Sequence, residues 1–124
     1  MVAGIFRDAD GRVLIAERLG DASFAGLWEF PGGKIDAGET RDDALRRELK
    51  EELGVEIVSF QHFQSLEHDY PDRRVSIDFY LVSRWLGQPS GLQGQGLKWL
   101  PIDQLEEKIL LPADVPIVRA LNLL

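Results

Sequence analysis

The sequence contains no cysteine among its 124 residues. Disulfide bridges, thiolate nucleophiles and zinc-thiolate sites are therefore all excluded. No apolar run approaches the roughly 18 residues that a transmembrane helix needs, and the N-terminus lacks the basic start and apolar stretch of a signal peptide. We therefore expect a cytoplasmic protein that neither spans nor binds a membrane.

Positive charge is also scarce, with 14 Lys and Arg residues against 21 Asp and Glu and a net charge of -7. A field of that sign repels the phosphate backbone of a polynucleotide, but it still permits a small anion bound locally through metal ions. The composition, 44% hydrophobic and 28% charged, is typical of a globular domain. We expect one domain over residues 1–124, as a monomer or a weak homodimer.

Segments in which apolar and polar residues alternate, separated by turn residues, predict several strands. These cover residues 1–7, 13–18, 28–30, 55–67, 75–86 and 97–100, with loops at 19–27 and 87–96. An Asp-Gly turn within 8–12 predicts a hairpin of the first two strands. The turn at 70–73 predicts antiparallel pairing of the two long strands.

One helix has clear signals at both ends, over residues 41–53. Thr40 is a capping residue, Asp43 completes a capping-box pattern, and Gly54 is a C-terminal stop. Residues 102–108 and 114–123 are further amphipathic helix candidates. These patterns by themselves indicate an α+β fold.

The helix over 41–53 carries an unusual group of acids, Glu48, Glu51 and Glu52. At about 100° per residue they share an arc roughly a quarter of the circumference wide, beside a stripe of leucines. Like charges at these spacings repel by about 0.2–0.5 kcal/mol per pair in water. A hard cation such as Mg²⁺, which prefers carboxylate oxygens, offsets this repulsion. The alternative is a solvated acidic helix face.

A longer pattern decides between these interpretations. It reads Gly33-x5-Glu39-x7-Arg47-Glu48-Leu49-x-Glu51-Glu52-x-Gly54-Val55. Agreement at all these positions arises by chance on the order of once in 10⁹ sequences. The pattern is the Nudix box, and the chain resembles the Nudix hydrolases.

The resemblance extends beyond the box. The segments at 29–35, 70–73 and 81–85 are similar to the bacterial MutT subgroup, whose members hydrolyse 8-oxo-dGTP and related triphosphates to the monophosphate and pyrophosphate. The resemblance implies an α/β/α sandwich with a mixed β-sheet between helices. It also implies a Mg²⁺ cofactor, with Mn²⁺ as a substitute, and a small nucleoside triphosphate as partner.

The same resemblance implies roles for individual residues. Metal ligands are expected at the Gly32 carbonyl, Glu48, Glu51 and Glu52. Glu48 would also orient or deprotonate the attacking water, and Arg47 would hold the carboxylates in place. Gly33, Glu39 and Gly54 would support the loop and the helix.

Other positions are expected to meet the substrate. Arg18 and Lys34 match positions that contact phosphate, where a cation stabilises the charge that develops in phosphoryl transfer; solvated surface residues are the alternative. Phe30, Arg73 and Asp114 match positions near the nucleobase.

Two positions depart from the MutT pattern. Gln93 occupies the place of a further carboxylate in the loop after the long strands, and an amide oxygen is a poorer Mg²⁺ ligand. Asp114 replaces an asparagine that reads the oxidised guanine; an ionised aspartate only accepts hydrogen bonds, whereas asparagine also donates. Asp114 therefore fits guanine N–H groups or the cytosine amino group, or it caps the last helix.

Three functions remain open from these residues. The first is hydrolysis of 8-oxo-dGTP. The second is a Nudix pyrophosphohydrolase acting on CTP, a modified pyrimidine nucleotide or another nucleoside diphosphate derivative. The third is a non-catalytic nucleotide-binding module, against which the complete set of acids argues.

Overall fold

A computed structural model describes residues 1–19 and 24–124 of the chain. Part of the loop expected at 19–27, residues 20–23, therefore lies outside the described residues. The described elements are β1 (Val2–Phe6), β2 (Arg12–Glu17), β3 (Trp28–Glu29), β4 (Gly32–Gly33), α1 (Arg41–Leu53), β5 (Glu56–Tyr70), β6 (Arg73–Leu86), β7 (Leu97–Pro101) and α2 (Val115–Leu121). Three short 3₁₀ turns, η1 (Ile102–Gln104), η2 (Glu107–Ile109) and η3 (Pro112–Asp114), precede α2.

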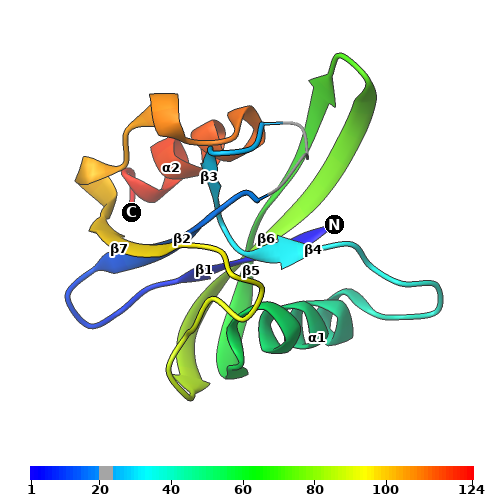
Figure 1. The fold of residues 1–124 in the computed structure, drawn as a ribbon, viewed down its shortest axis with the longest axis vertical. Coiled ribbons are helices and arrows are strands. Elements are labelled where there is room, and N and C mark those ends of the chain that lie inside the picture. Colours follow the sequence, from blue (N-terminus) through cyan, green and yellow to red (C-terminus); the bar gives the residue numbers. More distant parts are fainter. Residues whose placement is uncertain (20–23) are drawn as a thin grey trace.

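The strands form two sheets (Figure 1). The larger sheet has the order β4-β1-β6-β5, with β1 parallel to β6 and the other pairs antiparallel. The smaller sheet, β3-β2-β7, is antiparallel throughout. The expected mixed sheet is confirmed, as is the antiparallel pairing of the two long strands.

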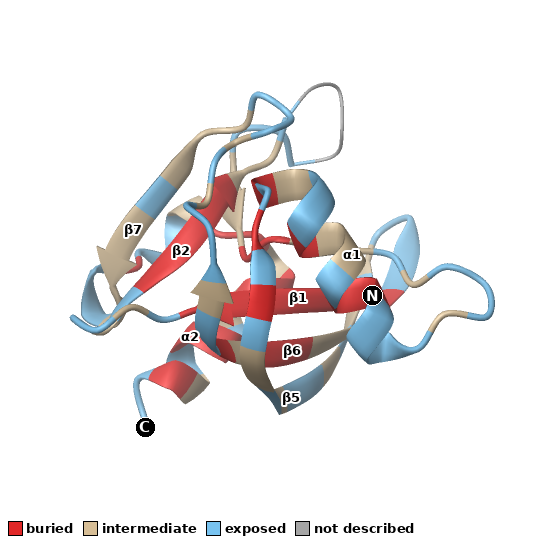
Figure 2. Ribbon diagram, turned by 90° about the horizontal axis from the view of Figure 1, so that it is seen from below, coloured by how far each residue is buried: buried red, intermediate tan, exposed pale blue. Residues whose placement is uncertain are grey.

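Helices cover both faces of the strands, which gives the expected sandwich (Figure 1). Along β1, Val2 and Phe6 pack in the core on the α1 side, whereas Ala3 and Ile5 pack in the core on the α2 side. Every residue of β1 is buried (Figure 2). The leucine stripe of α1 has no solvent exposure, and each such side chain stabilises the fold by about 1.5–3 kcal/mol.

The ends of α1 lie where the sequence predicts them. The Thr40 side chain accepts a hydrogen bond from the Asp43 backbone N–H at 3.1 Å. Gly54 adopts a left-handed conformation with φ 72° and its N–H donates to the Lys50 carbonyl, which ends the helix. The acids of the helix are thereby held in a defined register relative to the buried stripe.

The hairpin predicted for the first two strands forms only at its turn, where the Asp8 N–H donates to the Arg12 carbonyl at 3.0 Å. β1 and β2 belong to different sheets and are joined by the single bridge Arg7↔Val13. The reason is burial on both faces of β1, which places this strand inside the larger sheet between β4 and β6.

Of the two helices predicted near the C-terminus, the one over 114–123 is confirmed as α2, whereas the one over 102–108 is wrong. Residues 102–108 form η1 and the start of η2, because the chain extends at Leu105 and Glu106 between the turns. Leu105 is buried while the residues around it are exposed, so this segment has no stripe long enough to hold a regular helix. The last helix begins later than predicted, at Val115 after the turn η3.

Within residues 1–19 and 24–124, no helix combines the length and apolar character that crossing a bilayer requires.

Candidate active site

Arg47 lies at the centre of a network between the loop after β4 and helix α1. Its Nε and Nη2 donate to the two carboxylate oxygens of Glu39, at 2.8 and 2.9 Å. Its Nη1 donates to Glu48 at 3.0 Å and to Glu51 at 3.3 Å, and its Nη2 also donates to the Lys34 carbonyl at 3.0 Å. These hydrogen bonds, above all those that Arg47 donates to Glu39, raise the pKa of Arg47, which keeps the guanidinium charged. One side chain therefore orients two of the expected metal ligands.

Glu39 connects this network to the loop itself. Besides the bidentate pair with Arg47, it accepts a hydrogen bond from the Asp36 backbone N–H at 3.0 Å. The hydrogen bonds from Arg47 hold the pKa of Glu39 below its ordinary value. This placement suits the supporting role predicted for Glu39, away from the reacting atoms.

Two adjacent glycines let backbone and carboxylates approach closely. A Cβ at Gly33 would overlap the carboxylate of Glu48, and a Cβ at Gly32 would overlap the backbone of Val2 on β1. Any larger residue would displace either the acid or the β4–β1 pairing. The local sequence thus brings the Gly32 peptide beside the acidic face of α1.

The carboxyl of Glu52 has a raised pKa. Burial, followed by the negative charges of Glu48 and Glu29, raises the pKa of Glu52 to about 8, and the nearby polar backbone of Gly32 only partly opposes this. Within the described residues, its Oε2 is buried without a hydrogen-bond partner. A buried carboxylate oxygen without a partner, next to a second acid, fits a bound divalent cation.

As the side chains stand, no three carboxylates or imidazoles of the described residues are grouped around one point as ion ligands. Glu48 and Glu51 contact Arg47 instead, and the Glu51 side chain is half exposed. Recruiting Glu51 would require a change of its side-chain rotamer. The assignment of individual metal ligands stays a prediction.

The loop between β6 and β7 is attached to the end of α1. The Glu52 carbonyl accepts from the Leu92 backbone N–H at 3.1 Å and from Gln95 Nε2 at 3.0 Å. Gln95 Oε1 in turn accepts from the Gln93 backbone N–H at 2.9 Å. Gln93 and Glu52 line one cavity together. Gln95 was not predicted from the sequence, because a loop glutamine carries no distinguishing pattern.

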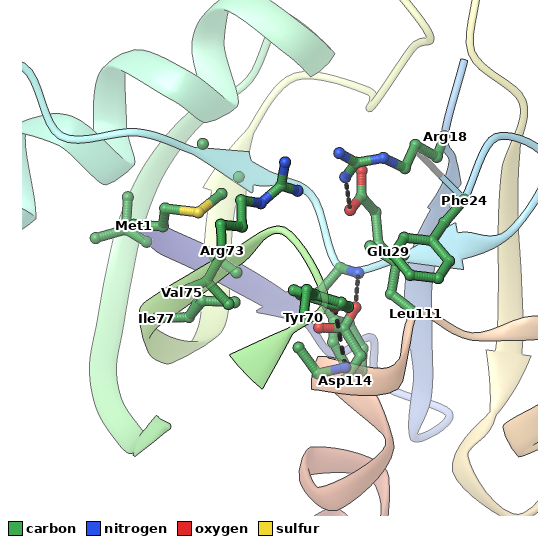
Figure 3. Close-up of a pocket in the computed structure, with 16 residues that line it drawn as sticks. Met1, Arg18, Phe24, Glu29, Tyr70, Arg73, Val75, Ile77, Leu111 and Asp114 are labelled. Carbon is green, nitrogen blue, oxygen red and sulfur yellow. Dashed lines mark hydrogen bonds and ion pairs between the residues drawn. The ribbon is translucent and has the colours of Figure 1, made fainter. Parts of the chain in front are cut away.

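A second cavity forms a cleft beside this acidic region (Figure 3). Its lining includes Arg18, Glu29, Phe30, Tyr70, Arg73 and Asp114. All three positions predicted near a nucleobase, Phe30, Arg73 and Asp114, therefore meet in one cleft. Arg73 lies over the Tyr70 ring, with its guanidinium 5.7 Å from the ring centroid. Tyr70 belongs to the turn segment quoted for the family resemblance, and its wall position was not predicted.

Asp114 is the buried polar residue of this cleft, with 4% exposure. Its Oδ2 accepts a hydrogen bond from the Phe30 N–H at 3.0 Å (Figure 3). Burial is the main cause that raises the pKa of Asp114 to about 8, which favours the neutral carboxyl at pH 7. A neutral carboxyl both donates and accepts, whereas the ionised form expected from the sequence only accepts. Asp114 makes no side-chain hydrogen bond that caps α2, which rules out the capping alternative.

The two residues expected at phosphate lie in different surroundings. Lys34 is exposed, and its carbonyl is bound by Arg47. Arg18 forms an ion pair with Glu29, with 3.2 Å between Nη1 and Oε2. Glu29 was not predicted as a site residue. It belongs to the segment 29–35 that resembles the family, but the resemblance implied no role for it.

The fold, the glycine-rich loop and the acidic helix together define a hydrolase of the Nudix type. The NUDIX domain model matches residues 1–121, and the chain belongs to this family. Nudix hydrolases in general depend on a divalent metal.

Within the family the chain is similar to the MutT proteins. It is 40% identical to the 8-oxo-dGTP diphosphatase of Escherichia coli K12 over 98% of this chain and 95% of that protein. It is 34% identical to the CTP pyrophosphohydrolase of the same organism, over 97% of this chain and 88% of that protein. A MutT structure from work on Aliivibrio salmonicida and Vibrio cholerae superposes with a TM-score of 0.81 at 39% identity, over 97% and 93% of the two chains.

Proposed function

We propose that the chain hydrolyses a nucleoside triphosphate, 8-oxo-dGTP before others, to the monophosphate and pyrophosphate. The observation that supports this proposal is a pair of adjoining cavities that share Arg18 and Glu29. One is lined by Phe30 and Asp114 and the other by Glu52. A base held at Asp114 therefore has its phosphates on the side of Glu52.

Magnesium would be held by Glu52 and Glu48, with the Gly32 carbonyl and Glu51 completing the expected set, and Mn²⁺ would substitute for it. When bound, the ion supplies charge neutralisation for the phosphates and polarises water. The buried Oε2 of Glu52, which has no partner within the described residues, supports this assignment.

The remaining chemistry falls to the chain's own side chains. Arg47 fixes the Glu48 carboxylate, which takes the proton of the attacking water. The water oxygen forms a bond to phosphorus while the bond between that phosphorus and the oxygen of the leaving pyrophosphate breaks. The attacking and leaving oxygens lie on opposite sides of the phosphorus. The exposed Lys34 lies on the loop where its cation meets the phosphate charge.

Base preference follows from the protonation of Asp114. Phe30 occupies Oδ2, which leaves the other oxygen of a neutral carboxyl to donate or accept. An 8-oxoguanine presents an N7–H donor next to the O6 acceptor, whereas guanine presents two acceptors. A group that does both is therefore complementary to the oxidised base.

Hydrolysis of CTP is the second candidate function. Cytosine also places a donor, its amino group, beside an acceptor, N3, so neutral Asp114 suits this base as well. The similarity to a CTP pyrophosphohydrolase supports the same alternative. A cytoplasmic location and a monomer or weak homodimer remain part of the proposal.

The test is magnesium-dependent pyrophosphate release from 8-oxo-dGTP, dGTP, CTP and dCTP, compared as kcat/KM. We expect 8-oxo-dGTP to rank first. A higher value for CTP would select the second candidate. Binding without release from any of the four would mean a non-catalytic nucleotide-binding module.

A further inference from the structure

Arg18 and Glu29 form an ion pair at the junction of two cavities. Both side chains line the cleft that contains Asp114, and both also line the cavity shared by Glu52 and Gln93. The pair is partly shielded from solvent, with side-chain exposures of 22% and 29%. Figure 3 shows the two side chains directed toward one another at the edge of the cleft, apart from Asp114.

This pair leaves one donor and one acceptor unused. Among the described residues, Arg18 Nε is buried without a hydrogen-bond partner. Glu29 uses Oε2 for Arg18 Nη1, and no other described residue donates to its Oε1. A buried N–H without an acceptor is destabilising, so a ligand atom that accepts from it is favoured.

A hydroxyl group can satisfy the unused donor and the unused acceptor at once. A hydroxyl accepts from Arg18 Nε and donates to the Glu29 carboxylate, whereas a phosphate only accepts. Glu29 also compensates the charge of Arg18 and repels any anion placed beside it. The site is therefore poorly suited to phosphate.

The position between the two cavities selects the part of the nucleotide concerned. Asp114 lines one cavity and Glu52 lines the other, and Arg18 and Glu29 line both. In a nucleotide whose base lies at Asp114 and whose phosphates lie toward Glu52, the group between them is the pentose.

We propose that Arg18 and Glu29 bind a hydroxyl of the nucleotide's pentose, with Arg18 Nε donating to it and Glu29 accepting from it. This inference rests on the proposed function, because it assumes a nucleotide lying between Asp114 and the acidic helix. It replaces the phosphate contact predicted for Arg18 and makes the pair a determinant of sugar specificity.

Binding of nucleoside monophosphates tests the inference without hydrolysis. Calorimetry compares GMP, dGMP and 2′,3′-dideoxy-GMP on the wild type, Glu29→Ala and the milder Glu29→Gln. The control is Glu56→Ala, which removes an exposed carboxylate at the start of β5. Circular dichroism of each variant confirms that it folds.

The wild type should bind at least one hydroxyl-bearing nucleotide about 10-fold or more tightly than its deoxy counterpart, as expected for a hydrogen bond to a charged group. A difference between dGMP and dideoxy-GMP identifies the 3′ hydroxyl, and one between GMP and dGMP the 2′ hydroxyl. In Glu29→Ala this ratio should fall to within about 2-fold. Glu56→Ala should retain the wild-type ratio.

Other results would overturn the inference. An unchanged ratio in Glu29→Ala would remove Glu29 from the sugar site, as would equal weakening of all three nucleotides. A change confined to base preference would place Glu29 at the base instead. Sugar discrimination that depends on Glu29, in a protein that releases no pyrophosphate, would support this inference while refuting the proposed function.

Discussion

Replacing Asp114 with asparagine should stabilise the protein at neutral pH. Burial raises the pKa of Asp114 from 3.8 to about 8, so the folded state favours the neutral acid. The free energy that such a carboxyl contributes to folding is fully present below the pKa of the unfolded state, 3.8. It is lost as the pH rises from that value to the pKa of the folded state, about 8. Within that window each pH unit costs the wild type up to about 1.4 kcal/mol of unfolding free energy. Asparagine has the shape of the neutral acid, still accepts from the Phe30 N–H, and has no such dependence.

We therefore expect Asp114→Asn to exceed the wild type by about 2–4 kcal/mol at pH 7.5, below the full linkage value because the folded site relaxes around a charge. Urea denaturation at pH 5, 6, 7 and 8 measures the difference, which should grow with pH and level off above about 8. Asp103→Asn, at an exposed position, should show no such growth. A difference that is flat across this range, or a variant less stable than the wild type at pH 8, would show that Asp114 is ionised and compensated in the fold.

The same variant reports on base recognition. Because neutral aspartic acid and asparagine both donate and accept, Asp114→Asn should leave the ranking of 8-oxo-dGTP, dGTP, CTP and dCTP unchanged at pH 6.5. Above about pH 8 the wild type ionises and the two rankings should diverge. Loss of the donor is expected to shift relative kcat/KM by about 5- to 150-fold. Equal scaling of all four substrates above about pH 8 would place Asp114 outside the recognition site.

Three further predictions concern the acidic helix and its surroundings. Glu48→Gln and Glu52→Gln should each lower kcat by about 10²-fold or more with the fold intact, because each removes metal or base function. Asp42→Asn, at an exposed position on the same helix, should change kcat little. Comparable losses of kcat in all three variants would indicate general helix damage. Gln93→Glu should lower the magnesium concentration for half-maximal activity, since it restores a carboxylate beside Glu52; a magnesium titration that shows no decrease would place Gln93 outside the metal shell. Gly33→Ala should reduce kcat strongly, because the added Cβ overlaps the Glu48 carboxylate, and wild-type kcat would mean that Glu48 needs no such position.

The local sequence alone determined the element that carries the chemistry. Thr40 and Gly54 define where α1 begins and ends, and the 3.6-residue period then places Glu48 and Glu52 beside the buried leucine stripe. These features depend on contacts between residues no more than four positions apart, which is why they could be predicted. The long antiparallel pair β5 and β6 was predictable for the same reason, since a short turn joins it.

Only the tertiary structure decided the features that depend on distant segments. β1 lies inside the larger sheet because burial on both faces outweighs the local hairpin signal. The pKa of Asp114 is raised because the surrounding core excludes water from it, and the hydrogen bond from Phe30, 84 positions earlier, only partly opposes this. The unused groups of Arg18 and Glu29 likewise follow from two strands that meet at a cavity junction. The desolvation of a group depends on all the atoms packed around it, and a local sequence pattern does not reveal which distant segments supply those atoms.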